Sequence, residues 1–300
     1  MKKKFSLINP QYAPRSWFVL FNTIFFVLLM AAMIVPIFKI FADSMINQTV
    51  YGLNLLPRTV NKVTGDSIWF DTVAYQRIIS DPSLYKPFLI SVYTTLMTTF
   101  LGLLISTLGA YVLIQREMPG VKFFGYLLLF TMIFNGGLIP TFLVMKGIGL
   151  MNTLWAVMLP MSMNVYNLVL MRSFFEGIPT SLFEAAEIDG CTPMGVFIRI
   201  VLPLSKAALA SIGLFFAVAA WSEYFHYVMY ISDTSLYNFQ YKLRDLFADK
   251  VETAPESGDK INVKTLQSAA VIVSIVPFMF IYPFCQKYFM TGVTMGAVKE

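Results

Sequence analysis

The stretch TSLFEAAEIDGCTPMGVFIRIVLPLSK, residues 180–206, decides the fold because it is charged and separates two apolar segments. The flanking segments, residues 153–174 and 207–230, each have the roughly 20 apolar residues that a helix needs to cross a bilayer. Between them, Glu184, Glu187 and Arg199 carry charges that are costly to place in hydrocarbon. We therefore expect a membrane protein with a polar, structured loop between two of its spans.

The first half of this loop has the signals of a short helix. Ser181, followed three residues later by Glu184, fits a capping box, in which each side chain accepts a backbone N–H of the first turn. Gly190 is suited to the left-handed conformation that commonly ends a helix. These signals predict a helix over residues 182–189, in which Glu184 needs no partner outside the chain.

The second half of the loop predicts another helix directly after the glycine. Thr192 can cap its first turn, and Pro193 occupies the first helical position, where a missing N–H costs nothing. We expect this helix to reach about Val201 and to end before Pro203. Two short helices joined by a hinge would stand at the membrane surface, which is suited to docking a protein.

The composition extends this interpretation to the whole chain of 300 residues. Apolar residues make up 57% and charged residues 13%, with a mean hydropathy of +0.67, whereas soluble domains carry about 25% charged residues. The sequence thus predicts an all-α integral membrane protein with six transmembrane helices. The six apolar stretches are Trp17–Phe38, Phe88–Ile114, Phe123–Val144, Thr153–Phe174, Ala207–Tyr230 and Leu266–Phe289.

Charge and motif content exclude several other functions. The net charge of +5 is no sign of nucleic-acid binding, since membrane proteins carry basic residues at their cytoplasmic ends. His226 is the single histidine, so a histidine-rich metal site is excluded. No phosphate-binding motif G-x-x-x-x-G-K-[ST] occurs, and ATP hydrolysis would therefore need another polypeptide.

Basic residues before the first apolar stretch predict the orientation. Lys2, Lys3, Lys4 and Arg15 precede it without any acidic residue, which places the N-terminus in the cytoplasm. The stretch is longer than the 7–15 residues of a secretory signal. Six spans would return the C-terminus to the cytoplasm and put the 180–206 loop there as well. The expected organisation is a cytoplasmic tail (1–16), a first transmembrane helix with a long external loop (17–87) and a core domain (88–300).

The polar loop closely resembles the EAA loop of ABC importer permeases. The matching residues are Glu184, Ala185, Ala186, Asp189, Gly190, Ile200, Leu202 and Pro203. The resemblance runs from about Tyr75 to the C-terminus and is to the carbohydrate branch, the maltose-type and oligosaccharide-importing inner-membrane components of binding-protein-dependent transport. Two positions depart from the family pattern: Ile90-Ser91 stands for Asn-Ser, and Trp221-Ser222-Glu223 for Trp-Asn.

The resemblance implies a type I ABC importer transmembrane domain in the bacterial cytoplasmic (inner) membrane, which imports an oligosaccharide or other sugar. Its implied partners are a second, homologous permease subunit, two ATP-binding subunits and an extracytoplasmic solute-binding protein, with no nucleic acid. The chain itself would hold no cofactor, because ATP and Mg²⁺ would bind the ATPase subunits. Coupling to those subunits is expected to involve Glu184, Ala185, Ala186, Asp189 and Gly190.

A candidate substrate path follows from the fifth apolar stretch. Glu223, His226, Tyr227 and Tyr230 are spaced i, i+3, i+4 and i+7 and would share one face of a helix. An ionisable residue inside a span usually faces a cavity or the bundle interior, and tyrosine suits sugar rings. An interfacial aromatic belt for the tyrosines and an internal partner for Glu223 are the alternatives.

In the fourth stretch, Asn164 and Asn167 also share a face. They are candidates for the same path, and hydrogen bonding between helices is the structural alternative.

Two rival functions come from other classes. Glu223 and His226, three residues apart, could act as the acid–base pair of a membrane-embedded enzyme, although the chain offers neither a nucleophile–base set nor a metal cluster. An ion-coupled carrier is the other rival, but it would leave the docking loop unexplained. The permease is the interpretation that accounts for the loop.

Overall fold

The computed structural model describes residues 16–46, 58–60, 67–115, 117–248 and 262–297. Nearly all of the predicted N-terminal tail lies outside these residues. The chain forms two compact units, one of residues 1–77 with 253–272 and one of residues 78–252 with 273–300. This division differs from the predicted one, which placed the boundary after residue 87 and kept residues 88–300 together.

The first unit contains α1 (Ser16–Ser44), a hairpin of β1 (Arg58–Val60) and β2 (Ser67–Trp69), most of α2 (Val73–Ser80) and the start of α14 (Val263–Ala297). The strands pair antiparallel, with Thr59 opposite Ile68. The side chains along α1 from Trp17 to Phe38 are largely exposed and apolar, which suits a helix surrounded by lipid or by another membrane subunit.

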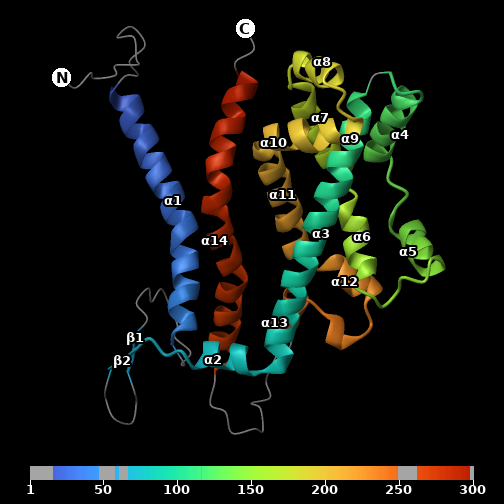
Figure 1. The fold of residues 1–300 in the computed structure, drawn as a ribbon. Coiled ribbons are helices and arrows are strands. Elements are labelled where there is room, and N and C mark those ends of the chain that lie inside the picture. Colours follow the sequence, from blue (N-terminus) through green and yellow to red (C-terminus); the bar gives the residue numbers. More distant parts are fainter. Residues whose placement is uncertain (1–15, 47–57, 61–66, 116, 249–261, 298–300) are drawn as a thin grey trace. The chain divides into compact units, whose positions relative to one another are not determined.

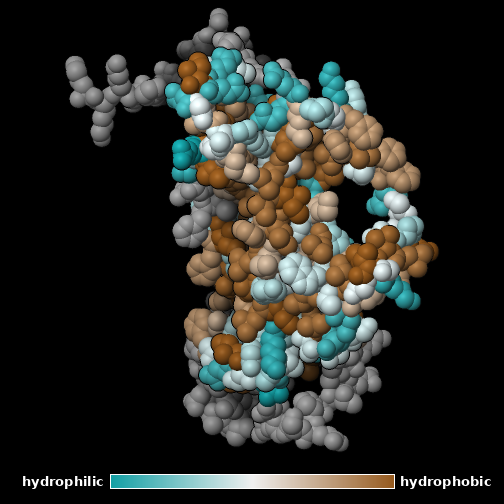
Figure 2. All heavy atoms as spheres, turned by 45° about the vertical axis from the view of Figure 1, so that its right-hand side comes forward, coloured by the Kyte–Doolittle hydropathy of each residue, from teal (hydrophilic) through white to brown (hydrophobic). Residues whose placement is uncertain are grey.

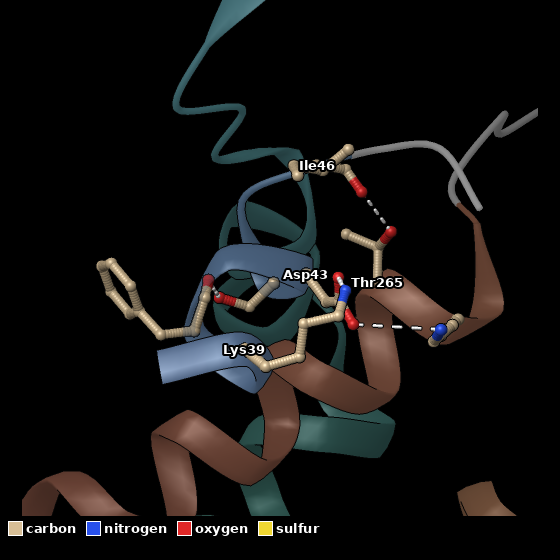
Figure 3. Close-up of polar contacts among 7 residues, drawn as sticks. Lys39, Asp43, Ile46 and Thr265 are labelled. Carbon is tan, nitrogen blue, oxygen red and sulfur yellow. Dashed lines mark hydrogen bonds and ion pairs between the residues drawn. The ribbon is translucent and has the colours of Figure 1, made fainter. Parts of the chain in front are cut away.

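The end of α1 is held by polar contacts that the sequence did not suggest (Figure 3). Asp43 bonds Lys39 one turn earlier and lies 3.9 Å from the amine of Lys264 on α14. The hydroxyl of Thr265 donates a 2.6 Å bond to the backbone carbonyl of Ile46. Ala42, Ser44 and Ile46 are fully buried. These contacts tie the end of the first helix to the beginning of the last one within the first unit (Figure 3).

The second unit is built around α3 (Pro82–Ile114), which packs against α6, α7 and α11 (Figure 1). Asp81 caps α3 by accepting the N–H of Ser83 at 2.8 Å. The remaining elements of this unit are α4 (Val121–Ile133), α5 (Leu138–Gly147), α6 (Trp155–Ser162), α7 (Val165–Glu176), α8 (Thr180–Ile188), α9 (Pro193–Val196), η2 (Phe197–Val201), α10 (Leu202–Leu204), α11 (Lys206–Trp221), α12 (Phe225–Tyr230), η3 (Thr234–Leu236), α13 (Phe239–Ala248) and the rest of α14.

Apolar side chains cover the middle of the face that carries α4 and α5, and hydrophilic ones gather toward its two ends (Figure 2). In α4 none of the residues is buried, and Phe123, Leu127 and Phe130 are exposed. Such a band is expected for a surface that meets hydrocarbon, where no polar group finds a partner.

The predicted all-α membrane fold is confirmed, and several of the helices that carry the predicted spans are bent or broken. Within the described residues, three helices are long and apolar enough to cross a membrane: Trp17–Ser44, Pro82–Ile114 and Val263–Pro283. Two bent pairs raise the number to at most five: α4 with α5, bent by 118°, and Pro193–Leu204 with α11, bent by 81°. The predicted fourth span is divided between α6 and α7, and the predicted fifth between α11 and α12.

Side chains that accept backbone N–H groups accompany these breaks. After α4, the Asn135 side chain accepts the N–H of Gly137, whose φ of +90° is in the range that favours glycine. Between α6 and α7, Asn164 accepts the N–H of Asn167 at 3.0 Å. A hydropathy pattern reports apolar length and not helix continuity, so it does not locate these breaks; the Gly and Pro residues near them are the local signal.

At Gly102, α3 packs closely against α11. A β-carbon there would lie 2.6 Å from the Phe216 ring of α11, and that ring is buried. We predict that Gly102→Ala destabilises the protein by about 1–3 kcal/mol through overpacking. The measurement is thermal unfolding of the purified complex.

Gly125 on α4 supplies the matched control, because a β-carbon there meets nothing closer than 3.9 Å. Gly125→Ala should leave stability unchanged or raise it slightly, since alanine favours helices. Equal melting temperatures for the two alanine variants would contradict the packing argument.

Candidate functional site

The first helix of the 180–206 loop, α8, begins at Thr180, and its N-cap is Pro179 without a side-chain cap bond. The predicted capping box of Ser181 and Glu184 is therefore wrong. Ser181 lies inside the first turn, because the helix starts two residues earlier than predicted and directly follows the proline. Glu184 consequently has no capping role and is exposed.

The predicted end of α8 is confirmed. Asp189 is the C-cap, and Gly190 follows with a φ of +72°. The N–H of Gly190 donates to the carbonyl of Glu187 at 3.0 Å, and the N–H of Cys191 donates to the carbonyl of Ala186 at 2.9 Å. These bonds satisfy the last carbonyls of the helix, so the turn depends on the left-handed conformation of Gly190.

The second helix begins as predicted, but it does not end before Pro203. Thr192 accepts the N–H of Gly195 at 3.2 Å and caps α9. The chain then passes through the π-helical turn η2 and continues as α10 to Leu204. Proline at position 203 has no N–H and would crowd the carbonyl of Arg199, so a widened turn at this point lets the helix continue past it.

The five residues predicted for coupling do not share one environment. Ala186 is buried, while Glu184, Ala185, Asp189 and Gly190 are exposed. The inward face of α8 thus holds the helix in place, and its outward face is free. Ala186 contributes packing to the site and not contact surface.

Sequence reasoning missed Ile188, whose surface is 86% exposed. It lies one turn after Glu184 and three residues after Ala185, so the three side chains form one outward face of α8. In the sequence, Ile188 stands between the acidic residues Glu187 and Asp189. An isolated apolar residue in a polar loop is the signal that could have indicated a contact surface. We call Glu184, Ala185 and Ile188 the outer face of α8.

The loop rests on a hydrophobic cluster that connects it to the spanning helices. Val196, Phe197 and Val201 pack with residues of α7 and α11, including the buried Phe175. Tyr111, near the end of α3, donates its hydroxyl to the carbonyl of Pro193 at 2.8 Å. Its ring lies 5.0 Å from that of Phe197. The loop is therefore joined to the core helices and is not a free surface segment.

A cavity of about 390 Å³ lies between this loop and the ends of α3 and α7. Its lining includes Tyr111, Arg172, Glu184 and Glu187. Arg172 pairs with Glu176 at 2.9 Å, so one acid of the lining is already neutralised from within the chain.

At the opposite end of the second unit, the predicted continuous helix over residues 207–230 is broken (Figure 1). Glu223 lies in the break between α11 and α12, where its carboxylate accepts the N–H of His226 at 2.8 Å. The imidazole Nδ1 of His226 lies 3.0 Å from the same oxygen, which makes an ion pair when the ring is protonated. Glu223 therefore closes the first turn of α12.

Tyr227 and Tyr230 are buried, with 0% and 2% of their surface exposed. The Tyr227 hydroxyl donates to that of Thr94 on α3 at 3.1 Å, and the Tyr230 ring stacks on Phe142 with centroids 6.4 Å apart. His226 and Tyr230 share a face of α12, with ring centroids 5.7 Å apart, whereas Glu223 lies in the break before this helix. The two tyrosines pack within the core of the described part of this unit.

Asn164 and Asn167 are brought together, but by local capping. Asn164 is exposed and caps α7, whereas Asn167 is buried. Because the Asn167 side chain is buried, a substrate could contact it only if the core rearranged. The exposed Asn164 side chain needs no such rearrangement.

Residues in and beside the two departures from the resembled pattern have structural partners. Ser91 accepts the N–H of Phe239 at 2.9 Å, which fixes α13 on α3. The indole N–H of Trp221 donates to the carbonyl of Ser274 at 3.0 Å. The backbone carbonyl of Glu223 accepts the side-chain amide of the fully buried Asn238. Asn238 was not noticed in the sequence, yet it joins the break to α13.

Comparison with known proteins decides the family. Residues 123–294 match the family described as the inner membrane component of binding-protein-dependent transport systems. The chain belongs to this family. It is 40% identical over 237 residues to the polygalacturonan/rhamnogalacturonan transport system permease protein YtcP of Bacillus subtilis (strain 168), covering 77% of this chain and 82% of that protein.

Two further relatives agree with this assignment. The arabinooligosaccharides transport system permease protein AraQ of Halalkalibacterium halodurans is 28% identical, covering 70% of this chain and 72% of that protein. The solved structure of a bacterial ABC transporter involved in the import of the acidic polysaccharide alginate matches with a TM-score of 0.82 at 27% identity, covering 93% of this chain and 99% of that chain.

The chain is thus a multi-pass inner-membrane permease subunit of a carbohydrate ABC importer with the type I transmembrane fold. ATP hydrolysis takes place in partner subunits, and permease subunits of this family have no cofactor of their own. The importer works with ATPase and binding-protein partners. The rival interpretation of Glu223 and His226 as the acid–base pair of an enzyme is therefore wrong.

The bond from Tyr111 to Pro193 generates a prediction about the loop. Tyr111→Phe removes one hydrogen bond and keeps the ring contact with Phe197, so we expect a loss of about 1 kcal/mol at this junction. Backbone N–H groups of residues 194–201 should then exchange with deuterium about five times faster, as measured by mass spectrometry of the complex.

Tyr126→Phe is the control, since Tyr126 is 73% exposed and its loss should leave exchange in the loop unchanged. Unaltered exchange in both variants would show that the Tyr111 bond does not hold the loop.

Proposed function

We propose that this permease moves an oligosaccharide into the cell by alternating access, paired with a second, homologous permease subunit. Two ATPase subunits would bind at the cytoplasmic side, and a solute-binding protein would deliver the sugar from outside. The basic residues before α1 support cytoplasmic N- and C-termini, which would place the 180–206 loop against the ATPase. The names of YtcP and AraQ support an oligosaccharide as the substrate.

The single observation that carries this proposal is the two-faced helix α8. Its outer face of Glu184, Ala185 and Ile188 is exposed, and an isoleucine that is 86% exposed at a polar end of the molecule is suited to a partner's hydrophobic groove. Its inner face is held by Ala186 and by the cluster beneath the loop. A partner that displaces α8 would therefore displace the packed core with it.

Transmission to the other end would follow α3. Tyr111 joins this helix to the loop, and Ser91 joins it to α13. The stretch between these residues covers roughly 30 Å at about 1.5 Å per residue, which is the thickness of the hydrocarbon core. ATP would drive the change only if it binds one conformation of the assembly more tightly than the other.

Glu223, His226 and Asn164 remain our candidates for the substrate path. Each is at least partly exposed and lies at a helix break, where polar groups are available. Tyr227 and Tyr230 are weaker candidates, because both side chains are buried and the Tyr227 hydroxyl is bonded to Thr94.

The test replaces Gly190 with residues that differ in their tolerance of the left-handed backbone conformation. Position 190 has a φ of +72°, and a β-carbon added there would meet no atom within 4 Å, so space is not limiting. Asparagine tolerates the left-handed conformation, whereas a β-branched valine does not. We predict that Gly190→Asn keeps most coupled transport and that Gly190→Val lowers the sugar taken up per ATP about tenfold or more.

Uptake and ATP hydrolysis are measured on the same proteoliposomes, with the amount of assembled complex as the control. Coupled transport by Gly190→Val at normal complex levels would overturn the coupling role. Equal losses in both variants would show that the position acts through something other than backbone conformation.

A further inference from the structure

Three tyrosines and an arginine form a stacked column at the end of the second unit opposite the 180–206 loop. The rings of Tyr237 and Tyr241 stack with centroids 3.7 Å apart, and Tyr224 stacks on Tyr241 at 5.8 Å. The guanidinium carbon of Arg244 lies 4.5 Å from the centroid of the Tyr224 ring. The four side chains come from the α11–α12 break, the segment after η3, and α13, so the fold assembles the column.

The column stands on a fixed base. Asn238 accepts the N–H of Tyr241 at 2.9 Å and bonds the carbonyl of Glu223, while Phe239 bonds Ser91 and packs edge-on against Phe88 at 5.6 Å. The bond with Tyr237 raises the pKa of Tyr241 to about 12, with burial adding to the effect, so its phenol stays protonated. The position of Arg244 is thus set by the rings beneath it.

The charge of Arg244 is not used within the described part of the chain. Its side chain is exposed, and no carboxylate of the described residues lies within ion-pair distance. The adjacent Asp245 accepts a bond from Lys242 at 2.7 Å, and it is close enough to Tyr241 for its charge to act on that phenol. A guanidinium stacked on a ring keeps its N–H edge free, and that planar fork matches the two oxygens of a carboxylate.

We propose that Arg244, held by Tyr224, binds the carboxylate of an anionic sugar residue, a uronate, as the oligosaccharide enters the permease. This inference rests on the proposed import of an oligosaccharide and names its chemical class. The guanidinium would donate two parallel hydrogen bonds to the carboxylate, and the phenol edges of the column would contact sugar hydroxyls. A neutral sugar has no carboxylate for Arg244, so it would make only the contacts between its hydroxyls and the phenols.

The experiment uses the complete importer in proteoliposomes with its binding protein and an oligogalacturonate as the probe. Arg244→Gln should raise the KM for uptake about tenfold or more, the loss expected for a charge-assisted bidentate contact. Arg244→Lys, which keeps the charge without the fork, should fall between this variant and the wild type. Tyr224→Leu should weaken uptake in the same direction, because it removes the ring that orients the guanidinium.

Lys242→Gln is the matched control, since it removes the same charge from the same helix. Unchanged uptake with Lys242→Gln supports the site, whereas an equal loss in both variants would show a general effect of charge and overturn it. Wild-type uptake by Arg244→Gln would overturn it as well. Weaker docking of the binding protein to the Arg244→Gln complex, measured without sugar, would assign the surface to that protein and reject the sugar site.

Two results with the wild-type importer separate this inference from the function on which it rests. Coupled uptake of neutral oligosaccharides with none of oligogalacturonate would reject the uronate site and leave the proposed function standing. Absence of coupled uptake for every sugar, with an intact complex, would reject the proposed function itself.

Discussion

Backbone polar groups that enter hydrocarbon must find partners inside the protein, and the second unit is organised around this constraint. Three of its helix breaks place an unpaired N–H close to a side-chain acceptor: Asn135 serves the turn before α5, Asn164 the start of α7 and Glu223 the start of α12. Each acceptor permits a bend where a single span would otherwise be required. Those bends place polar groups between apolar helices of the unit.

The same unit connects two distant polar ends through one unbroken helix. The α3 helix contacts the 180–206 loop through Tyr111 and contacts α13 through Ser91, and its small residues allow α11 to approach closely at Gly102. A long helix is rigid along its axis. Because α3 has no break between its ends, a displacement of one end moves the other end as well. This arrangement offers a physical basis for coupling between the proposed ATPase contact at the 180–206 loop and the proposed sugar site near α13.

The two ends differ in how their polar residues are used. At the loop end, the outer face of α8 exposes Ile188 beside Glu184, a surface that combines apolar area with charge. At the other end, Asn238 and Glu223 use their polar atoms on backbone groups, and Arg244 is the charge that remains available among the neighbours described here. The loop end is thus suited to a protein, and the α13 end to a small anionic ligand.

The sequence alone determined the class of the protein and the local structure of its loop. Apolar length identified a membrane protein, and the glycine and threonine signals correctly located the end of α8 at Gly190 and the cap of α9 at Thr192. These features depend on residues close together in the chain, whose preferences are local. The EAA pattern was specific enough to indicate the family that the comparisons then established.

Tertiary structure alone decided where helices continue and which side chains face inward. The periodicity placed Tyr227 with Glu223 on one face, but the break at residues 222–224 buried the tyrosine against Thr94 of α3. The capping box of Ser181 failed because α8 starts directly after Pro179, and Ala186 turned inward because the cluster beneath it is built from distant helices. Burial depends on contacts between segments far apart in the chain, and a local pattern carries no information about them.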